Sequence, residues 1–150
     1  MSTSHEHTSH SQTPRRIFLK QAGGGIATAA LLPVARFAHA AGNDTLKLAL
    51  IGCGGRGSGA ANQALNATPG IRLVALADVF RDQIDKSHAN LSKQHPEKVT
   101  VSETDKLVGF EAYKQAIALA DAVVLATPAA FRPLHFEEAV RQGKHIFMEK

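Results

Sequence analysis

The chain has 150 residues, which is room for one ordinary folded domain, and its content of 44% hydrophobic and 20% charged residues excludes a disordered protein. Of the formal net charge of +4, residues 1–40 account for +3 (four Lys or Arg against one Glu) and residues 41–150 for +1 (13 against 12), so the charge gives no case for nucleic acid binding. The single cysteine, Cys53, excludes an internal disulfide and a zinc site made of several cysteines.

Residues 1–40 have the organisation of an export leader. A polar segment, whose histidines are interpreted as part of a solvated tail rather than as a metal site, precedes the pair Arg15-Arg16. A mildly apolar stretch follows at residues 22–35, and Ala38-His39-Ala40 supplies a small-x-small cleavage site. This order resembles the signal peptides of the bacterial twin-arginine translocation (Tat) pathway; a chance arginine pair before an anchoring helix is the weaker alternative. We expect cleavage after Ala40 and a periplasmic or otherwise exported protein.

A glycine turn is the feature around which the folded part is organised. The apolar run Leu46–Ile51 predicts a strand, which ends in the G-x-G-x-x-G pattern of Gly52, Gly54 and Gly57. A small-residue segment suited to a helix follows at residues 58–66. Gly52 permits the tight turn, Gly54 allows the backbone to approach a pyrophosphate, and Gly57 allows close packing of helix and strand. This order predicts a dinucleotide-binding turn, with the first N–H groups of the helix facing the diphosphate.

Three further residues of the turn, Cys53, Gly55 and Arg56, are assigned to the same cofactor site. The position of Cys53 suggests a small side chain that is tolerated near the ligand. A catalytic thiol is the weaker interpretation, because no partner residue for it is identifiable.

An acidic residue about 20 positions after the turn is the second part of the dinucleotide pattern. The strand predicted over residues 71–77 ends at Asp78, 21 residues after Gly57, and the carboxylate is expected to accept hydrogen bonds from the adenosine ribose hydroxyls. The alternative is that Asp78 only caps the following helix. Arg81 could reach a 2′-phosphate and favour NADP, but Asp78 would repel that phosphate. We therefore expect NAD as the cofactor, with NADP as the alternative.

The rest of the chain alternates helices with short strands. Helices are expected at residues 81–94, 110–119 and 131–142, and strands at 99–101, 122–126 and 144–150. This alternation predicts an α/β fold in residues 41–150, a Rossmann-type doubly wound parallel sheet with helices on both faces.

Other catalytic schemes find little support in the residues. A short-chain dehydrogenase is disfavoured, because the residue four positions after Tyr113 is Ile117 rather than lysine. A methyltransferase is disfavoured, because the apolar residues that run into Gly52 lack the acidic residue usual there. His135 is interpreted as a helix-surface or partly packed residue, because nothing nearby in the sequence would orient it as a base.

The residues from Gly143 to Lys150 resemble a family signature. They read Gly-Lys-His-Ile-Phe-Met-Glu-Lys, which is similar to the G-K-H-V-x-x-E-K-P string of the Gfo/Idh/MocA oxidoreductases, named after glucose–fructose oxidoreductase and inositol dehydrogenase. Residues 50–57 and Ala126-Thr127-Pro128, with His135 downstream, also resemble that family. The resemblance covers residues 45–150, the whole of the predicted folded domain.

By this resemblance, the glycine turn and Asp78 take the family's roles at the diphosphate and the ribose. Thr127 and Pro128 would line the nicotinamide side, and Glu149 would hydrogen-bond the nicotinamide ribose. Lys150 would be the catalytic residue, beside the nicotinamide and the substrate hydroxyl that loses its proton, where an ammonium can stabilise a developing alkoxide. An ordinary charged strand end is the alternative for Glu149 and Lys150.

The resemblance implies an exported NAD(P)-dependent oxidoreductase that transfers hydride to or from a sugar, polyol or related polyhydroxy compound. The alternatives are an NAD-dependent glycoside hydrolase of the same superfamily and a non-catalytic nucleotide-binding fragment. The Tat machinery would export the protein already folded around a cofactor bound in the cytoplasm.

The family pattern also extends past the last residue of the sequence. Its sixth strand and its substrate domain would follow Lys150, so we expect residues 41–150 to be an incomplete domain, truncated after the fifth strand. We expect this fragment to be inactive alone and the full-length protein to be a homo-oligomer.

Overall fold

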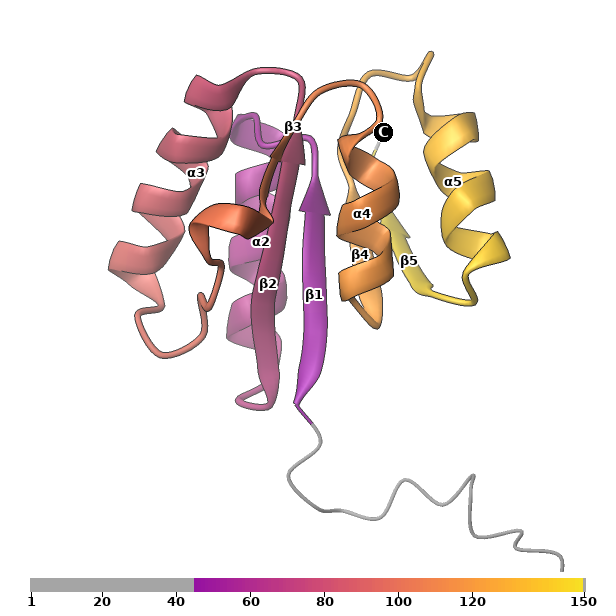
Figure 1. The fold of residues 1–150 in the computed structure, drawn as a ribbon. Helices are drawn as coiled ribbons and strands as arrows, with labels where there is room; N and C mark the ends of the chain where they lie inside the picture. Colours follow the sequence, from indigo (N-terminus) through magenta and orange to yellow (C-terminus); the bar gives the residue numbers. More distant parts are fainter. Residues whose placement is uncertain (1–44, 150) are drawn as a thin grey trace, which may run out of the picture. The chain divides into compact units, whose positions relative to one another are not determined.

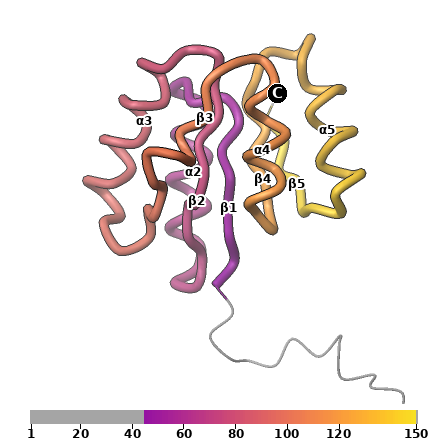
Figure 2. The backbone as a smooth tube through the Cα atoms, in the orientation of Figure 1, coloured from indigo at the N-terminus to yellow at the C-terminus, as the bar shows by residue number. Residues whose placement is uncertain are grey.

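The computed structural model describes residues 45–149 (Figures 1 and 2). The predicted leader at residues 1–40 and the predicted catalytic Lys150 lie outside this range. The elements in chain order are β1 (Leu46–Ile51), α2 (Gly55–Ala67), β2 (Ile71–Asp78), α3 (Arg81–Gln94), the 3₁₀ turn η2 (Glu103–Asp105), β3 (Lys106–Val108), α4 (Ala112–Leu119), β4 (Ala122–Leu125), α5 (Arg132–Arg141) and β5 (His145–Met148).

The strands form one parallel five-stranded sheet in the order β3-β2-β1-β4-β5. From β1 the chain builds outward through β2 and β3, and then returns to add β4 and β5 on the other side of β1 (Figure 1). The prediction of a doubly wound parallel sheet is therefore confirmed. The direction of winding reverses between β1 and β4, which is where open α/β sheets form their ligand crevice.

Alternating side chains of the central strands pack against helices on both faces of the sheet. Leu48 and Leu50 of β1 belong to the cluster that contains the buried residues of α2 and α3. Ala49 and Ile51 belong to the second cluster, with the buried residues of α4. Because successive residues of a strand point to opposite faces, one apolar run supplies both cores.

The third strand is not where the sequence predicts it. Residues 99–101 contribute only an isolated bridge, between Val99 and Leu73, and β3 lies at Lys106–Val108, paired with the end of β2. Two valines and a threonine have higher strand propensity than Lys-Leu-Val, but pairing partners decide which segment forms the ladder. The first helix also differs, because α2 begins at Gly55 rather than at residue 58.

β5 is an edge strand among the described residues. It pairs with β4 on one side, and its Phe147 and Met148 are 54% and 49% exposed. Within residues 45–149, no helix is long and apolar enough to cross a membrane.

Candidate functional site

A cavity of about 540 Å³ lies at the carboxyl ends of β1, β2 and β4, at the point where the sheet winding reverses. Five residues that the sequence assigns to the cofactor site line this cavity: Gly52, Gly54, Asp78, Thr127 and Pro128. They come from three separate loops of the chain. The parallel sheet brings these loops together because its strands all end on one side.

Gly52 and Gly57 are required by the protein's own packing. Gly52 has φ +96°, and a Cβ there would lie 2.8 Å from the carbonyl carbon of Ala126, which follows β4. A Cβ on Gly57 would lie 1.9 Å from the Gly52 carbonyl oxygen. The two glycines therefore let the turn pass against β4 and let α2 start against the turn, as the sequence predicts.

The packing of the protein does not explain why residue 54 is a glycine. Its φ of −65° suits any residue, and a Cβ there would meet no atom within 4 Å. Gly54 is also the N-cap of α2, whose first turn carries no acidic side chain and receives no side-chain cap. The unpaired N–H groups of a helix start attract an anion. An open approach to these groups fits a diphosphate at this end of the cavity.

The Asp78 carboxylate is held by two backbone donors. Its Oδ2 accepts a hydrogen bond from the Cys53 N–H at 2.7 Å, and its Oδ1 accepts one from the Phe80 N–H at 3.0 Å. The N-cap of α3 is Phe80, so the alternative in which Asp78 caps that helix is wrong. A carboxylate has about four lone-pair sites. Asp78 can therefore accept two further hydrogen bonds from ribose hydroxyls in the cavity.

The Cys53 side chain points into the core and does not line the 540 Å³ cavity, so its nearness to a bound cofactor stays a prediction. The side chain is 2% exposed, belongs to the core beneath α2 and α3, and places Sγ 3.6 Å from the Ala77 carbonyl oxygen. Burial, together with the nearby Asp78 charge, raises the pKa of the thiol far above its ordinary value. The thiol therefore stays protonated, which agrees with the view that it is no catalytic nucleophile.

Arg56 and Glu149 form an ion pair with each other. The Arg56 guanidinium lies 2.8 Å from Glu149 Oε2, and the Glu149 side chain is only 12% exposed. The Glu149 N–H also donates to the Leu125 carbonyl at 3.0 Å. The pair connects the first turn of α2 with the residue that follows β5, so Glu149 is more than a free charged strand end. Neither residue lines the 540 Å³ cavity.

His135 is buried and oriented, contrary to the expectation from the sequence. It is 6% exposed, its Nδ1 lies 3.1 Å from Thr127 Oγ1, and its ring lies 4.3 Å from the Tyr113 ring. Burial lowers the pKa of the imidazole, with a weaker opposing effect from Glu111. Neutral His135 can therefore hold the Thr127 hydroxyl in one orientation at the wall of the cavity.

Aromatic side chains form much of the remaining wall. Phe80, Phe110 and Phe131 are 64%, 64% and 41% exposed, and all three line the cavity. No motif in the sequence identifies these three residues. Phe80 and Phe110 each lie two residues after the end of a strand, β2 and β3, which is the signal that could have found Phe110 once β3 is placed correctly; Phe131 lies six residues after β4.

Within residues 45–149, no group of three or more His, Cys, Asp or Glu side chains is arranged to hold a metal ion. The assigned residues Gly55 and Gly57 lie beside the cavity rather than in its wall. The role of Lys150 stays a prediction, because that residue lies outside the described part of the chain.

Comparison with known proteins identifies relatives for most of the chain. Residues 46–150 match the GFO_IDH_MocA family, described as "Oxidoreductase family, NAD-binding Rossmann fold". Two curated relatives, each called a glycosyl hydrolase family 109 protein, come from Solibacter usitatus (strain Ellin6076) and Streptomyces niveus. They are 31% and 34% identical over 111 residues, which is 71% of this chain in both cases.

Among solved structures, apo scyllo-inositol dehydrogenase from Lactobacillus casei matches with a TM-score of 0.52 and 23% identity, over 72% of this chain and 29% of that one. This likeness concerns the fold. The chain spans 24% and 21% of the length of the two curated relatives.

Proposed function

We propose, from the premise that this chain belongs to the Gfo/Idh/MocA oxidoreductase family, that it is the nucleotide-binding part of an exported NAD(P)-dependent oxidoreductase. The proposed substrate is a sugar, polyol or related polyhydroxy compound. One observation carries the proposal: the glycine turn, Asp78 and the Thr127-Pro128 segment surround a single cavity at the reversal point of the sheet.

Each part of the cavity has a task in this proposal. The turn around Gly54 would bind the diphosphate through backbone N–H groups, and Asp78 would accept the adenosine ribose hydroxyls. Thr127, oriented by His135, would contact the nicotinamide end. The bound nicotinamide supplies hydride transfer, which no side chain can perform. Lys150, as an ammonium, would stabilise the alkoxide that develops on the substrate oxygen, and the aromatic wall would exclude water.

We favour NAD over NADP because of how Asp78 and Arg81 are engaged. The Asp78 carboxylate lies in the cavity wall and would repel a 2′-phosphate. Arg81 bonds to Asp85 at 3.1 Å and to Glu103 at 2.9 Å, so its guanidinium is already occupied by two carboxylates. Fluorescence titration of the full-length gene product with NADH and NADPH tests this. We expect tighter binding of NADH, and a preference for NADPH would contradict it.

The oxidoreductase proposal is tested with the purified full-length gene product and a panel of sugars and polyols. We expect a change in the absorbance of the reduced nicotinamide with at least one member of the panel. If the protein binds NADH but no compound in a broad panel changes the absorbance, the proposed reaction is contradicted, while the proposed cofactor site is not.

A second candidate is a glycoside hydrolase that uses bound NAD without net redox change. The observation that favours it is the identity of 31% and 34% to two proteins called glycosyl hydrolase family 109 proteins. The same cavity would serve this reaction, because the cofactor needs the same diphosphate and ribose contacts. Release of a chromogenic aglycone from aryl glycosides, without added cofactor, would support this candidate over the first.

We also propose that the protein is exported by the Tat pathway with its cofactor already bound. The support is the order of Arg15-Arg16, the apolar stretch and Ala38-His39-Ala40 in the sequence. Cell fractionation of the wild type and of the double variant Arg15→Lys, Arg16→Lys tests it. We expect the wild type in the periplasm and the variant in the cytoplasm, and equal export of both would contradict the proposal.

Homo-oligomerisation of the full-length protein is the remaining part of the proposal. Light scattering of the full-length protein measures its mass in solution. A mass equal to that of one chain would contradict it.

A further inference from the structure

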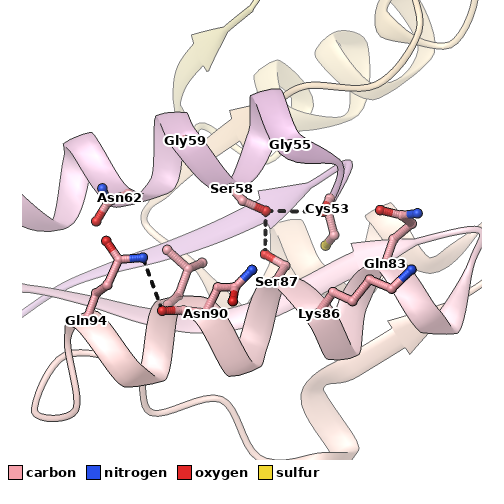
Figure 3. A pocket seen from close by; sticks show the side chains of 11 residues that line it. Cys53, Gly55, Ser58, Gly59, Asn62, Gln83, Lys86, Ser87, Asn90 and Gln94 are labelled. Carbon is pink, nitrogen blue, oxygen red and sulfur yellow. Dashed lines mark hydrogen bonds between the residues drawn. The ribbon is translucent and has the colours of Figure 1, made fainter.

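Two hollows adjoin the glycine turn, and different kinds of side chain line them. The hollow of about 390 Å³ between α2 and α3 is lined mostly by serine, asparagine, glutamine and lysine, and by no aromatic side chain of residues 45–149 (Figure 3). Polar groups there bond to one another, as Gln94 does to the Asn90 carbonyl and Ser58 to the Ser87 hydroxyl (Figure 3). The cavity of about 540 Å³ is lined instead by four aromatic rings: Phe80, Phe110, Tyr113 and Phe131.

Within residues 45–149, the Tyr113 hydroxyl makes no hydrogen bond, although every fully covered polar side-chain atom in this range has a partner. The hydroxyl is therefore reached by solvent, while the residue as a whole is only 3% exposed. Tyr113 lines the 540 Å³ cavity and not the hollow of Figure 3, so the hydroxyl opens into the former. Buried tyrosine hydroxyls usually find a partner. A ligand in the cavity would supply one.

The three phenylalanines of the cavity present exposed rings to the same space. Phe80, Phe110 and Phe131 are 64%, 64% and 41% exposed, and the ring centroids of Phe110 and Phe131 lie 6.0 Å apart. Exposed apolar side chains that gather at one hollow mark a binding surface. A nucleobase binds to proteins by stacking its face on aromatic rings and by hydrogen bonds at its edge. The phenylalanines and the Tyr113 hydroxyl offer both kinds of contact.

Asp78 indicates which ring of a dinucleotide would lie here. Its carboxylate accepts the Phe80 N–H at 3.0 Å, and its carbonyl accepts the Gly109 N–H at 3.0 Å, which holds the loop that carries Phe110 beside the end of β2. In the proposed function Asp78 binds the adenosine ribose, and the base on this ribose is adenine. None of the β5 residues, which precede the predicted nicotinamide-ribose contact Glu149, lines the cavity.

We propose that Tyr113 is a binding residue for the adenine base, with its hydroxyl bonded to the edge of the base and the phenylalanines packed on its faces. This inference rests on the proposed function. The Tyr113 ring lies 4.3 Å from the His135 ring and belongs to the core cluster beneath α4, so the hydroxyl is held in place before the ligand arrives. Little side-chain entropy is then lost on binding.

The test is isothermal titration calorimetry of the full-length gene product with NADH and with ADP, which retains adenine, its ribose and the diphosphate but lacks the nicotinamide. Tyr113→Phe should raise both Kd values by the same factor, about three- to tenfold, the range that one net hydrogen bond supplies. Thermal unfolding of the apo protein is the second readout. Because the hydroxyl has no partner within residues 45–149, its removal should leave the midpoint at or above that of the wild type.

A second variant tests the stacking contact and has a matched control. Phe110→Ala removes a ring that is 64% exposed, so the fold should persist, and both Kd values should rise about tenfold through lost base stacking. Phe136→Ala removes a ring of α5 that is 44% exposed and does not line the cavity, so its Kd values should match the wild type. Equal losses in the two variants would overturn the stacking contact, as would an unchanged Kd in Phe110→Ala.

The remaining outcomes separate this inference from the proposed function. A wild type that binds neither NADH nor ADP overturns the proposed function and this inference with it. If the wild type binds both ligands and Tyr113→Phe leaves both Kd values unchanged, only this inference is overturned, because the hydroxyl then faces water alone. A loss confined to NADH also overturns it, since the hydroxyl would then lie at the nicotinamide half. A lower unfolding midpoint in Tyr113→Phe would show that the hydroxyl serves the fold instead.

Discussion

The Asp78 carboxylate and the Cys53 backbone N–H are joined by a hydrogen bond of 2.7 Å, which links the end of β2 to the glycine turn. The predicted ribose ligand and the predicted diphosphate turn are thereby held in a fixed relation before any ligand arrives. A site that is already arranged loses less entropy on binding. The same carboxylate also accepts the Phe80 N–H, so its orientation is determined at both oxygens.

Asp78→Asn should weaken NADH binding about tenfold or more, because hydrogen bonds to a charged group contribute about 1.5–3 kcal/mol. The asparagine oxygen can still accept the Cys53 N–H, so the fold should persist. NADPH should lose less affinity than NADH, since the repulsion of the 2′-phosphate is removed. Isothermal titration calorimetry measures both. Asp82→Asn is the control, because Asp82 is exposed and pairs with Lys86; equal losses in both variants would contradict the role of Asp78.

Gly57→Ala and Gly59→Ala should have opposite effects on stability, although both lie in α2. A Cβ on Gly57 would approach the Gly52 oxygen to 1.9 Å, while a Cβ on Gly59 would meet nothing within 4 Å. Gly57→Ala should lower the free energy of unfolding by about 1–3 kcal/mol or more. Gly59→Ala should raise it by about 0.5–1 kcal/mol, the helix cost of glycine. Urea denaturation measures both free energies of unfolding. A Gly57→Ala protein as stable as the wild type would show that position 57 does not lie this close to the Gly52 carbonyl oxygen.

Gly54→Ala separates binding from folding. Its backbone conformation suits alanine and its Cβ would meet no protein atom, so the unfolding midpoint should stay within error of the wild type. The new methyl would stand where the backbone is expected to approach the diphosphate, and the Kd for NADH should rise about tenfold. Unchanged affinity in a folded Gly54→Ala protein would place the diphosphate elsewhere.

The fold and most of the cavity could be predicted because they depend on local signals. The apolar run Leu46–Ile51 predicts a strand, and the glycine spacing after it predicts a tight turn. Asp78 marks the end of the second strand. The position of β3 could not be predicted in the same way. It depends on which segment reaches the carboxyl end of β2, a contact between residues far apart in sequence. With β3 misplaced, Phe110 could not be recognised as a residue at the cavity.

The surroundings of the Cys53 and His135 side chains could not be predicted for a related reason. Neighbours in sequence do not determine which side of a turn a side chain takes, and Cys53 points into the core beneath α2 and α3. His135 is oriented by Thr127, eight residues earlier, and by Tyr113 of another helix. Both partners are known only when α4 and α5 are packed on the sheet.

His135 also gives the stability of the domain a pH dependence. Because burial lowers its pKa in the folded state, the unfolded chain binds a proton more readily. The stability that this residue contributes is complete above about pH 6.5, the ordinary pKa of imidazole, and is lost as the pH falls through the lowered value. Burial and the Lys106 charge lower the pKa of His88 as well, so His88 contributes with the same sign.

His135→Gln should therefore reduce the loss of stability between about pH 7 and pH 5, where imidazole titrates, without removing it, because His88 remains. Glutamine can still bond to Thr127 but does not gain a charge in acid. The free energy of unfolding is measured by urea denaturation at several pH values for the wild type, His135→Gln and His145→Gln. His145 is exposed and serves as the matched control. If the His135→Gln and wild-type curves stay parallel across this range, the imidazole is not held neutral by burial, and its bond to Thr127 needs another explanation.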